Sequence, residues 1–399
     1  MCSRTAKIAL VAVACTVPAT LQAQFNFTVD GRQVQIHSFA SQGFAYSGDN
    51  NYLTMKTSQG SFAFTDFGIN ASTQITDKFR VGAQLYDRNI GEFGQWHPEL
   101  DWASGDYRFK DWFGVRAGKV KTTLGLYNDS QDMDFLHTFA LLPQSMDPID
   151  SRSNTIAHTG ADVYGDIPIK RLGTFSYTGY AGRRPQDSTA GFILGTHPNA
   201  LFLDKITGWM EGGDLRWATP VGLLAGVSFL NQLPKGDGIS VKNGVAYPGG
   251  FTEDFDRTAQ YFVQYTLKGL RIDGEYARNY RIYRILNINF GHKVSEYDTR
   301  SWYLAAAYRI NKWFELGTYH SYYYANWGTD LSLPTNHEID HVATARFDLN
   351  RHWNVKVEGH FIDGHPTNAS AVRGFYLAVN PQGLQPQTNM LLIRTGVNF

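Results

Sequence analysis

The strongest constraint on the fold of this chain is an alternation of apolar and polar residues with a period of two. It is clear in 67–75 ("FGINASTQI"), 259–267 ("AQYFVQYTL") and 352–361 ("HWNVKVEGHF"). This period predicts β-strands with one apolar and one polar face. The alternating stretches run for about 9–13 residues, whereas strands of soluble proteins average about 5–6. Because a tilted strand needs about ten residues to cross a bilayer, the pattern predicts membrane-spanning strands.

Short polar links between these stretches predict how the strands are paired. Seven of them occur, around Asp77-Lys78, Lys110-Asp111, Pro168-Ile169, Pro220-Val221, Lys268-Gly269, Asn311-Lys312 and Asn350-Arg351. Longer connections rich in Gly, Asn, Pro and Asp lie between them, among them 48–60, 183–206, 233–256 and 364–386. Short connections on one side and long ones on the other are typical of outer-membrane barrels.

The number of links gives the number of strands. Seven short turns join fourteen strands in pairs, and strands near 34–46 and 390–399 bring the total to sixteen. The predicted fold is therefore all-β: a transmembrane antiparallel β-barrel of sixteen strands with short periplasmic turns and long extracellular loops. A soluble sandwich would have shorter strands, and a propeller would repeat a blade motif, which this sequence lacks.

The N-terminus predicts export. Arg4 and Lys7 precede an apolar stretch that ends at "LQAQF", which is the layout of a signal peptide, 1–23, cleaved before a single barrel domain, 24–399. The alternative is a lipoprotein signal processed at Cys15. Cleavage after residue 23 would remove both cysteines of the chain, Cys2 and Cys15, and with them any thiol chemistry.

The sequence argues against two classes of protein, helical membrane proteins and general nucleic-acid binders. No apolar stretch of 18 residues follows the predicted signal, so the sequence predicts no transmembrane helix. The net charge of zero argues against a general nucleic-acid binder. A sixteen-stranded barrel instead leaves an aqueous channel with a polar inner wall.

One connection is predicted to narrow that channel. Residues 119–152 form the third long loop, and its apolar portion, 135–142, favours a loop folded into the lumen over one exposed outside. Opposed acidic and basic groups across a pore filter ions and orient polar solutes. We therefore predict a constriction in which acidic loop residues face basic wall residues. The candidates are Asp129, Asp132 and Asp134 on the loop and Arg80, Arg88, Arg108, Arg116, Lys119 and Lys121 on the wall.

The alternating strands, the inserted third loop and the terminal Phe399 resemble those of sixteen-stranded Gram-negative outer-membrane porins. The resemblance implies passive diffusion of small hydrophilic solutes or ions, a homotrimer, contact with outer-membrane lipid and lipopolysaccharide, and recognition of Phe399 by the outer-membrane assembly machinery. Locally, 116–138 is similar to the phosphate-selective porins, with Gly118, Lys121 and Gly125 matching their Gly-x-x-Lys-x-x-x-Gly core. Phosphate specificity is not carried over, because the chain lacks a lysine cluster.

Other chemistry finds little support in the sequence. His337 and His341 have zinc-helix spacing, but their segment alternates as a strand, so we expect neither a metal nor a cofactor. Neighbouring Ser and His residues point to opposite faces of a strand, and no Gly-x-Ser-x-Gly motif occurs, so we expect no enzyme. The alternative to a channel is a closed or plugged outer-membrane barrel with a binding or structural role.

Overall fold

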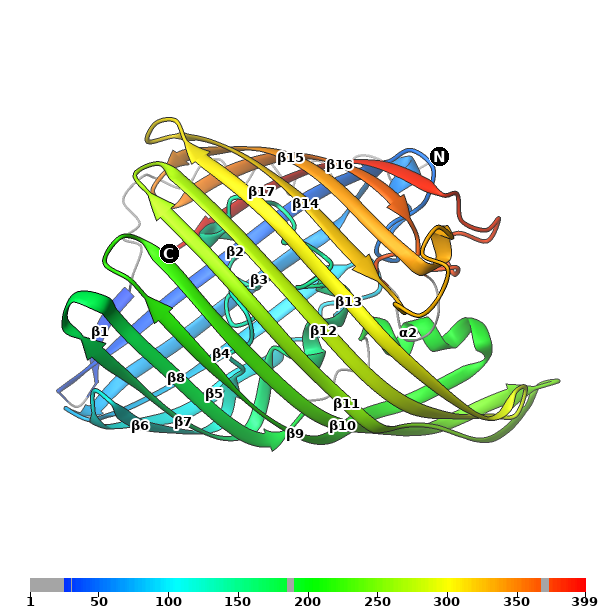
Figure 1. Ribbon diagram of the computed structural model, residues 1–399, viewed down its shortest axis with the longest axis horizontal. Coiled ribbons are helices and arrows are strands. Elements are labelled where there is room, and N and C mark those ends of the chain that lie inside the picture. The colour runs from blue at the N-terminus through cyan, green and yellow to red at the C-terminus, as the bar shows by residue number, and fades with distance from the viewer. Residues whose placement is uncertain (1–24, 30, 185–189, 367–372) are drawn as a thin grey trace.

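The chain forms one closed ring of antiparallel strands in the computed structural model (Figure 1). The structure describes residues 25–29, 31–184, 190–366 and 373–399. Within these residues, β2 to β17 each pair with the next strand along the chain, and β17 pairs with β2 to close the ring of sixteen. The ring has no free edge, as a barrel in lipid requires. The predicted sixteen-stranded antiparallel barrel is confirmed.

Most of the described chain is strand. The strands are β1 (Phe25–Val29), β2 (Arg32–Ser47), β3 (Ser61–Thr76), β4 (Phe79–Ile90), β5 (Glu99–Lys110), β6 (Phe113–Lys121), β7 (Ala157–Ile169), β8 (Gly173–Arg183), β9 (Leu201–Ala218), β10 (Leu223–Lys242), β11 (Val245–Leu267), β12 (Leu270–Asn287), β13 (Gly291–Arg309), β14 (Phe314–Tyr324), β15 (His337–Asn350), β16 (Trp353–Gly364) and β17 (Gln387–Asn398). The helical elements are α2 (Gly191–Thr196) and the 3₁₀ turns η2 (Thr57–Gln59), η3 (Asp134–Leu136), η4 (Ile149–Asn154), η5 (Lys170–Leu172), η6 (His197–Asn199) and η7 (Pro334–Asn336). No described helix is long and apolar enough to cross a membrane.

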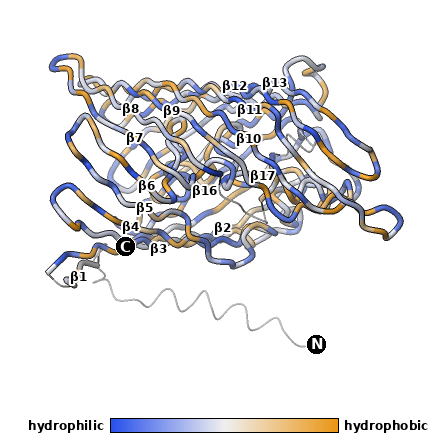
Figure 2. Tube along the Cα trace, turned by 90° about the horizontal axis from the view of Figure 1, so that it is seen from below, coloured by the Kyte–Doolittle hydropathy of each residue, from blue (hydrophilic) through white to orange (hydrophobic). Residues whose placement is uncertain are grey.

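The period-two pattern sorts side chains between the outside and the lumen, and Figure 2 shows the alternation along the strands. Tyr261 and Phe361 point outward with 55% and 57% of their surface exposed. Lys356 and Glu358, on the opposite face of β16, are 0% exposed because the lumen around them is filled. An apolar exterior around a polar interior is the arrangement of a membrane barrel.

The two ends of the barrel differ as predicted. All seven short links join strands at one end, here called the short-turn end, although the link predicted at Pro168-Ile169 lies two residues later, at η5. The longer connections join strands at the opposite end, here called the long-loop end. They comprise 48–60, 91–98, 122–156, 184–200, 325–336 and 365–386.

The long connection predicted at 233–256 is wrong. β10 and β11 continue through this stretch, and a two-residue turn at Asn243-Gly244 joins them. Both turn residues have positive φ, 51° and 77°, as the tightest hairpin turns require. The Gly and Pro residues of 233–256 suggested a loop, yet Asn-Gly between alternating residues is itself a hairpin signal. The β10–β11 and β12–β13 hairpins therefore extend beyond the rest of the wall (Figure 1).

The C-terminus closes the barrel. The backbone N–H of Phe399 donates to the Ser38 carbonyl at 2.7 Å, and the Ser38 N–H donates to the Phe399 carbonyl at 2.8 Å. The Phe399 ring stacks on His352 at the short-turn end, with 6.2 Å between ring centroids. β1 pairs with β2 next to this seam, outside the ring. The predicted signal peptide, 1–23, lies outside the described residues, as do Cys2 and Cys15.

Candidate functional site

The connection 122–156 between β6 and β7, called the lumen loop below, lies inside the barrel. Its residues bond to inward-facing side chains on strands from both halves of the ring, from β4 and β5 through β9, β10 and β12 to β16 and β17. The loop begins three residues and ends four residues later than the predicted 119–152, because β6 continues to Lys121 and β7 begins at Ala157.

The first part of the lumen loop binds the wall at β9, β10 and β12. The Gly125 N–H donates to Ser228 at 2.9 Å, and Arg216 donates to the Gly125 carbonyl at 2.7 Å. Gly125 has φ +61°, and any side chain there would collide with Gln260 and Glu275. A glycine is needed at this position because the backbone itself lies against the wall.

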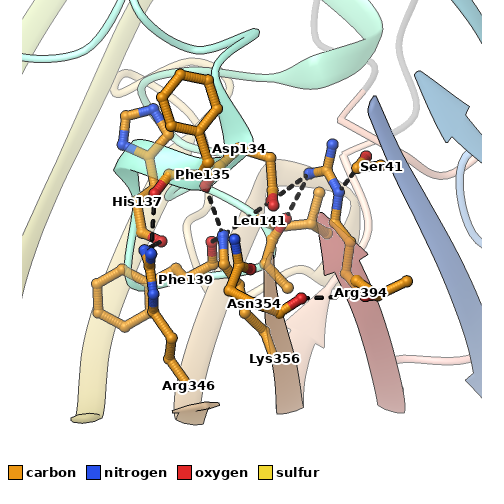
Figure 3. Close-up of polar contacts among 12 residues, drawn as sticks. Ser41, Asp134, Phe135, His137, Phe139, Leu141, Arg346, Asn354, Lys356 and Arg394 are labelled. Atoms are coloured by element: carbon orange, nitrogen blue, oxygen red, sulfur yellow. Dashed lines mark hydrogen bonds and ion pairs between the residues drawn. The ribbon is translucent and has the colours of Figure 1, made fainter. Parts of the chain in front are cut away.

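Asp134 anchors the far side of the loop through two cations. Its carboxylate lies 2.8 Å from Lys356 Nζ on β16 and 3.2 Å from an Arg394 nitrogen on β17. Figure 3 shows both side chains pointing up from the wall to the loop. Gly396 leaves room for this group, since a β-carbon there would lie 2.6 Å from an Asp134 oxygen. Burial would raise the pKa of Asp134, but Arg394 and Lys356 outweigh it and hold that pKa below its ordinary value.

Two further wall residues hold the loop backbone next to Asp134. The Glu358 carboxylate accepts hydrogen bonds from the N–H groups of Ala140 and Leu141, at 2.8 and 2.9 Å. Arg346 donates to the carbonyls of Phe135 and His137, at 2.9 and 2.6 Å (Figure 3). Hydrogen bonds with a charged partner are stronger than neutral ones, so these contacts fix the loop in one position.

A second charged cluster lies where the loop returns to β4, β5 and β6. Asp132 forms an ion pair with Lys121 at 2.6 Å and accepts a hydrogen bond from Gln84, also at 2.6 Å. Arg152 lies 2.7 Å from Asp101 and 3.8 Å from Asp132, and its guanidinium stacks over the Tyr86 ring at 4.1 Å. Asp132 and Arg152 are 1% and 5% exposed, so their charges are balanced almost entirely within the protein.

Only part of the predicted constriction comes together. Lys121 meets Asp132 directly and also donates to the Asp129 carbonyl at 2.9 Å. Arg88 donates to the Ile149 carbonyl of the lumen loop at 2.9 Å. The Asp129 side chain forms no ion pair with the described residues. Its burial raises the pKa of this carboxyl, against the opposing effect of Arg216 and Lys121.

Four predicted basic residues lie away from the loop acids. Arg108 pairs with Asp166 and Asp111 at the short-turn end, with 45% of its side chain exposed. Lys119 lies opposite Thr159, on the outer face, where its ammonium donates to the Leu100 carbonyl at 2.5 Å. Arg116 forms an ion pair with Asp162 at 2.9 Å, and Arg80 donates to Ser72 at 2.6 Å.

Regular alternation and one local register shift explain part of these differences. Lys119 is three residues from Arg116 on a strand of continuous register, so Arg116 faces the lumen and Lys119 faces outward. In the pairing of β4 with β5 the register shifts between Gln84 and Leu85, so that Asp101 is an extra residue of β5 and joins the lumen face. A one-residue shift exchanges the two faces of a strand, and period-two counting cannot locate it.

The sequence interpretation missed the cations that Asp134 binds. Lys356 and Arg394 were not among the candidates, because they lie more than two hundred residues from Asp134 along the chain. Arg152 was missed as well. The feature of the sequence that could have indicated a role for Arg152 is its position as the one arginine of an acidic loop.

The lumen loop separates two cavities. The upper chamber, of about 150 Å³, lies toward the long-loop end among β10 to β13, α2 and residues 145–155 of the loop. The lower chamber, of about 580 Å³, opens at the short-turn end and is lined by Arg80, Arg116, Trp102 and Phe135 among others. The two chambers share no lining residue.

His137 makes the attachment of the lumen loop sensitive to acid. The imidazole is 5% exposed, and its Nε2 lies 2.8 Å from the Ser130 carbonyl. Burial lowers the pKa of His137 to about 4, assisted by Lys356 and Arg271 and opposed by the bond to Ser130 and by Asp134. As the pH falls, His137 in the released loop therefore binds a proton at a higher pH than His137 in the packed loop. The stabilisation that neutral His137 gives to the packed loop is complete above pH 6.5 and is lost as the pH falls towards 4.

We expect acidification through this range to destabilise the packed loop by about 3 kcal/mol through His137. The measurement is hydrogen exchange of peptides covering 130–142 between pH 7 and pH 4, corrected for intrinsic exchange, in the native barrel and in His137→Gln. The native loop should loosen more steeply than the variant. Equal slopes would show that another group controls the acid response.

The chain matches no protein-family model and no curated protein. Solved outer-membrane barrels nevertheless share its fold. OmpT of Vibrio cholerae aligns over 94% of this chain and 100% of its own, with TM-score 0.56 and 11% identity. The anion-selective porin from Comamonas acidovorans aligns over 92% and 100%, with TM-score 0.56 and 11% identity. The outer membrane channel DcaP of Acinetobacter baumannii aligns over 94% and 99%, with TM-score 0.55 and 9% identity.

The chain has the outer-membrane porin fold. This porin-fold barrel confirms the resemblance at the level of architecture, and one OmpT structure is described as a trimer form. The local similarity of 116–138 to phosphate-selective porins is supported by no family model and stays a prediction.

Proposed function

We propose that this protein is an outer-membrane porin, a water-filled channel for passive diffusion of small hydrophilic solutes or ions. The observation that carries the proposal is the closed ring of sixteen strands with an apolar exterior and a polar lumen. A barrel of this strand number is wide enough for an aqueous channel. The lumen loop then limits the size of the solutes that pass.

The narrowest part of the route would be formed by the two charged clusters of the lumen loop. One contains Asp132, Lys121 and Arg152, and the other contains Asp134 with its two wall cations. This differs from the predicted facing rows, because most of these acids and bases touch each other. Asp101 and Asp66 also pair with these cations, so the acids and bases of the two clusters balance and the proposal is a channel of low charge selectivity.

The remaining partners follow from the proposed location. We infer a Gram-negative outer membrane, reached through the periplasm, with lipid and lipopolysaccharide around the apolar exterior. Phe399 would be the residue that the assembly machinery recognises, and the subunits would form homotrimers. The trimer form of OmpT supports this last inference by analogy alone.

A second function, a plugged barrel with a binding role, is favoured by one observation. The lumen loop binds the wall on opposite sides of the ring, at β9 and β10 and again at β16 and β17. A loop held at both sides obstructs the lumen more than a loop held at one side. A plugged barrel would carry no solute flux.

Liposome swelling tests the proposed function. Proteoliposomes containing the purified barrel are placed in isotonic sugars, amino acids or phosphate of increasing size, with heat-unfolded protein as the control. A channel predicts swelling that slows as the solute becomes larger. Swelling no faster than in the control, for every solute, would contradict the channel and favour the plugged barrel.

A further inference from the structure

The upper chamber has the chemistry of a binding site for a polar solute. Its volume of about 150 Å³ corresponds to about five water molecules at about 30 Å³ each, which is the scale of a small amino acid. Most of its lining side chains are amides and hydroxyls: Asn128, Ser145, Ser151, Asn154, Thr155, Gln232, Thr258, Gln260, Asn279, Thr299 and Ser301. A smaller apolar part is formed by Leu124, Leu230 and Phe192.

Two charged residues of the chamber lack an ion partner among the described residues. Asp147, on the lumen loop, is 7% exposed, and its Oδ2 atom has no hydrogen-bond partner in the described chain. Arg373, in the connection between β16 and β17, lies over the Tyr323 ring at 4.4 Å, and its Nε atom likewise has no partner there. The other charged lining groups are engaged, Asp256 by Asn279 at 2.5 Å and Arg281 by Glu253 at 4.0 Å.

The surroundings of Asp147 favour a positive charge beside its carboxylate. Burial raises the pKa of this carboxyl well above its ordinary value, and the carboxylates of Glu275 and Asp129 raise it further. A buried acid without a cation is costly, and a cation brought to it favours its ionised form. An ammonium group in the chamber would supply that charge.

Gln232 adds an independent acceptor. Its Oε1 atom is buried without a hydrogen-bond partner in the described chain, and the residue is 8% exposed on the lumen face of β10. Buried polar atoms are nearly always bonded, so an orphaned oxygen beside a cavity indicates a donor that occupies the cavity. Water could meet this need, but an ammonium or amino group would bond to both Gln232 and Asp147.

We propose that the upper chamber binds a small zwitterion of the α-amino acid class, with its ammonium group at Asp147 and its carboxylate at Arg373. The apolar side chain would lie against Leu124, Leu230 and Phe192. The bidentate guanidinium of arginine suits a carboxylate, and opposite charges on one chamber favour a molecule that carries both. The proposal rests on the proposed function, since the chamber would lie on the route of a permeating solute.

Calorimetry on the folded barrel in detergent at pH 7 tests the proposal with three probes. L-leucine carries both charges, 3-methylbutylamine has only the amine, and 4-methylpentanoate has only the carboxylate. L-leucine should bind at least about tenfold more tightly than either analogue, as expected when two charge-assisted contacts act together. Equal binding of all three probes, or no binding of L-leucine, would overturn the proposal.

Substitutions test which residue binds each charged group of L-leucine. Asp147→Asn should weaken L-leucine about tenfold and leave 4-methylpentanoate unchanged, whereas Arg373→Gln should weaken L-leucine and leave 3-methylbutylamine unchanged. Gln232→Leu, which removes an acceptor and no charge, tests the ammonium position if Asp147→Asn does not fold. Asp330→Asn, in the exposed connection before β15, is the matched control and should bind as the native barrel does. Native affinity in Asp147→Asn and Arg373→Gln would reject the site.

The two proposals can fail separately. A barrel that supports liposome swelling but binds L-leucine no better than its analogues keeps the channel and loses the zwitterion site. A barrel that binds L-leucine selectively but supports no swelling loses the channel and keeps the site.

Discussion

Asp134→Ala is expected to remove about 3–5 kcal/mol of the free energy that holds the lumen loop against β16 and β17. The carboxylate balances two buried cations, Lys356 and Arg394, which are 0% and 6% exposed. Without it, Lys356 has no carboxylate within 4 Å among the described residues, whereas Arg394 keeps Asp66 at 2.7 Å. A buried charge that loses its partner is among the most costly single changes in a protein.

The loss should appear as local release of the loop and not as unfolding of the barrel, because the strand pairing of the ring is untouched. Hydrogen exchange of peptides covering 130–142 measures it directly, and protection should fall by about two orders of magnitude or more. Asp129→Ala is the matched control, since this acid lies in the same loop and forms no ion pair with the described residues. Equal loss of protection in both variants would mean that Asp134 is not an anchor.

Arg152→Met is expected to have an effect of similar size, on the opposite side of the lumen. Arg152 lies between Asp101 and Asp132, and Lys121 would be the one cation left within 4 Å of these two buried acids among the described residues. The expected cost is about 3–5 kcal/mol. The pore would also lose one positive charge at its narrowest part, so its permeability should shift towards cations.

Two measurements check the Arg152→Met prediction. The urea midpoint of the folded barrel should fall, and the reversal potential in a salt gradient should move in the direction of cation preference. Arg108→Met provides the control, because Arg108 lies at the short-turn end with its side chain 45% exposed, where an ion pair contributes about 1 kcal/mol or less. An unchanged reversal potential in Arg152→Met would place the cluster away from the solute path.

The barrel itself could be predicted from the sequence because its main signals are local. Strand length and alternation are read from a single segment, and each short turn marks where one strand ends and its partner begins. An even strand count allows the first and last strands to pair antiparallel, as β2 and β17 do. The segment 233–256 was misread because Gly and Pro residues were given more weight than the Asn243-Gly244 turn, which is what continues the hairpin.

The site could be predicted only in part, since its contacts are not local. The apolar residues of 119–152 suggested a loop inside the lumen, and the structure places Lys121 beside Asp132. The partners of Asp134 depend on how far the loop crosses the ring, which no periodicity encodes. Lys119 was named together with Arg116 as a wall residue, although the two are three residues apart and regular alternation places Lys119 on the outer face.

Single-channel recording in planar bilayers tests most directly whether the lumen loop narrows an open channel. The native barrel should show ohmic current, and Asp134→Ala combined with Glu358→Gln, which loosens both anchors to β16, should show a larger and noisier current. Current in the double variant together with none in the native barrel would contradict the channel and identify the loop as a plug.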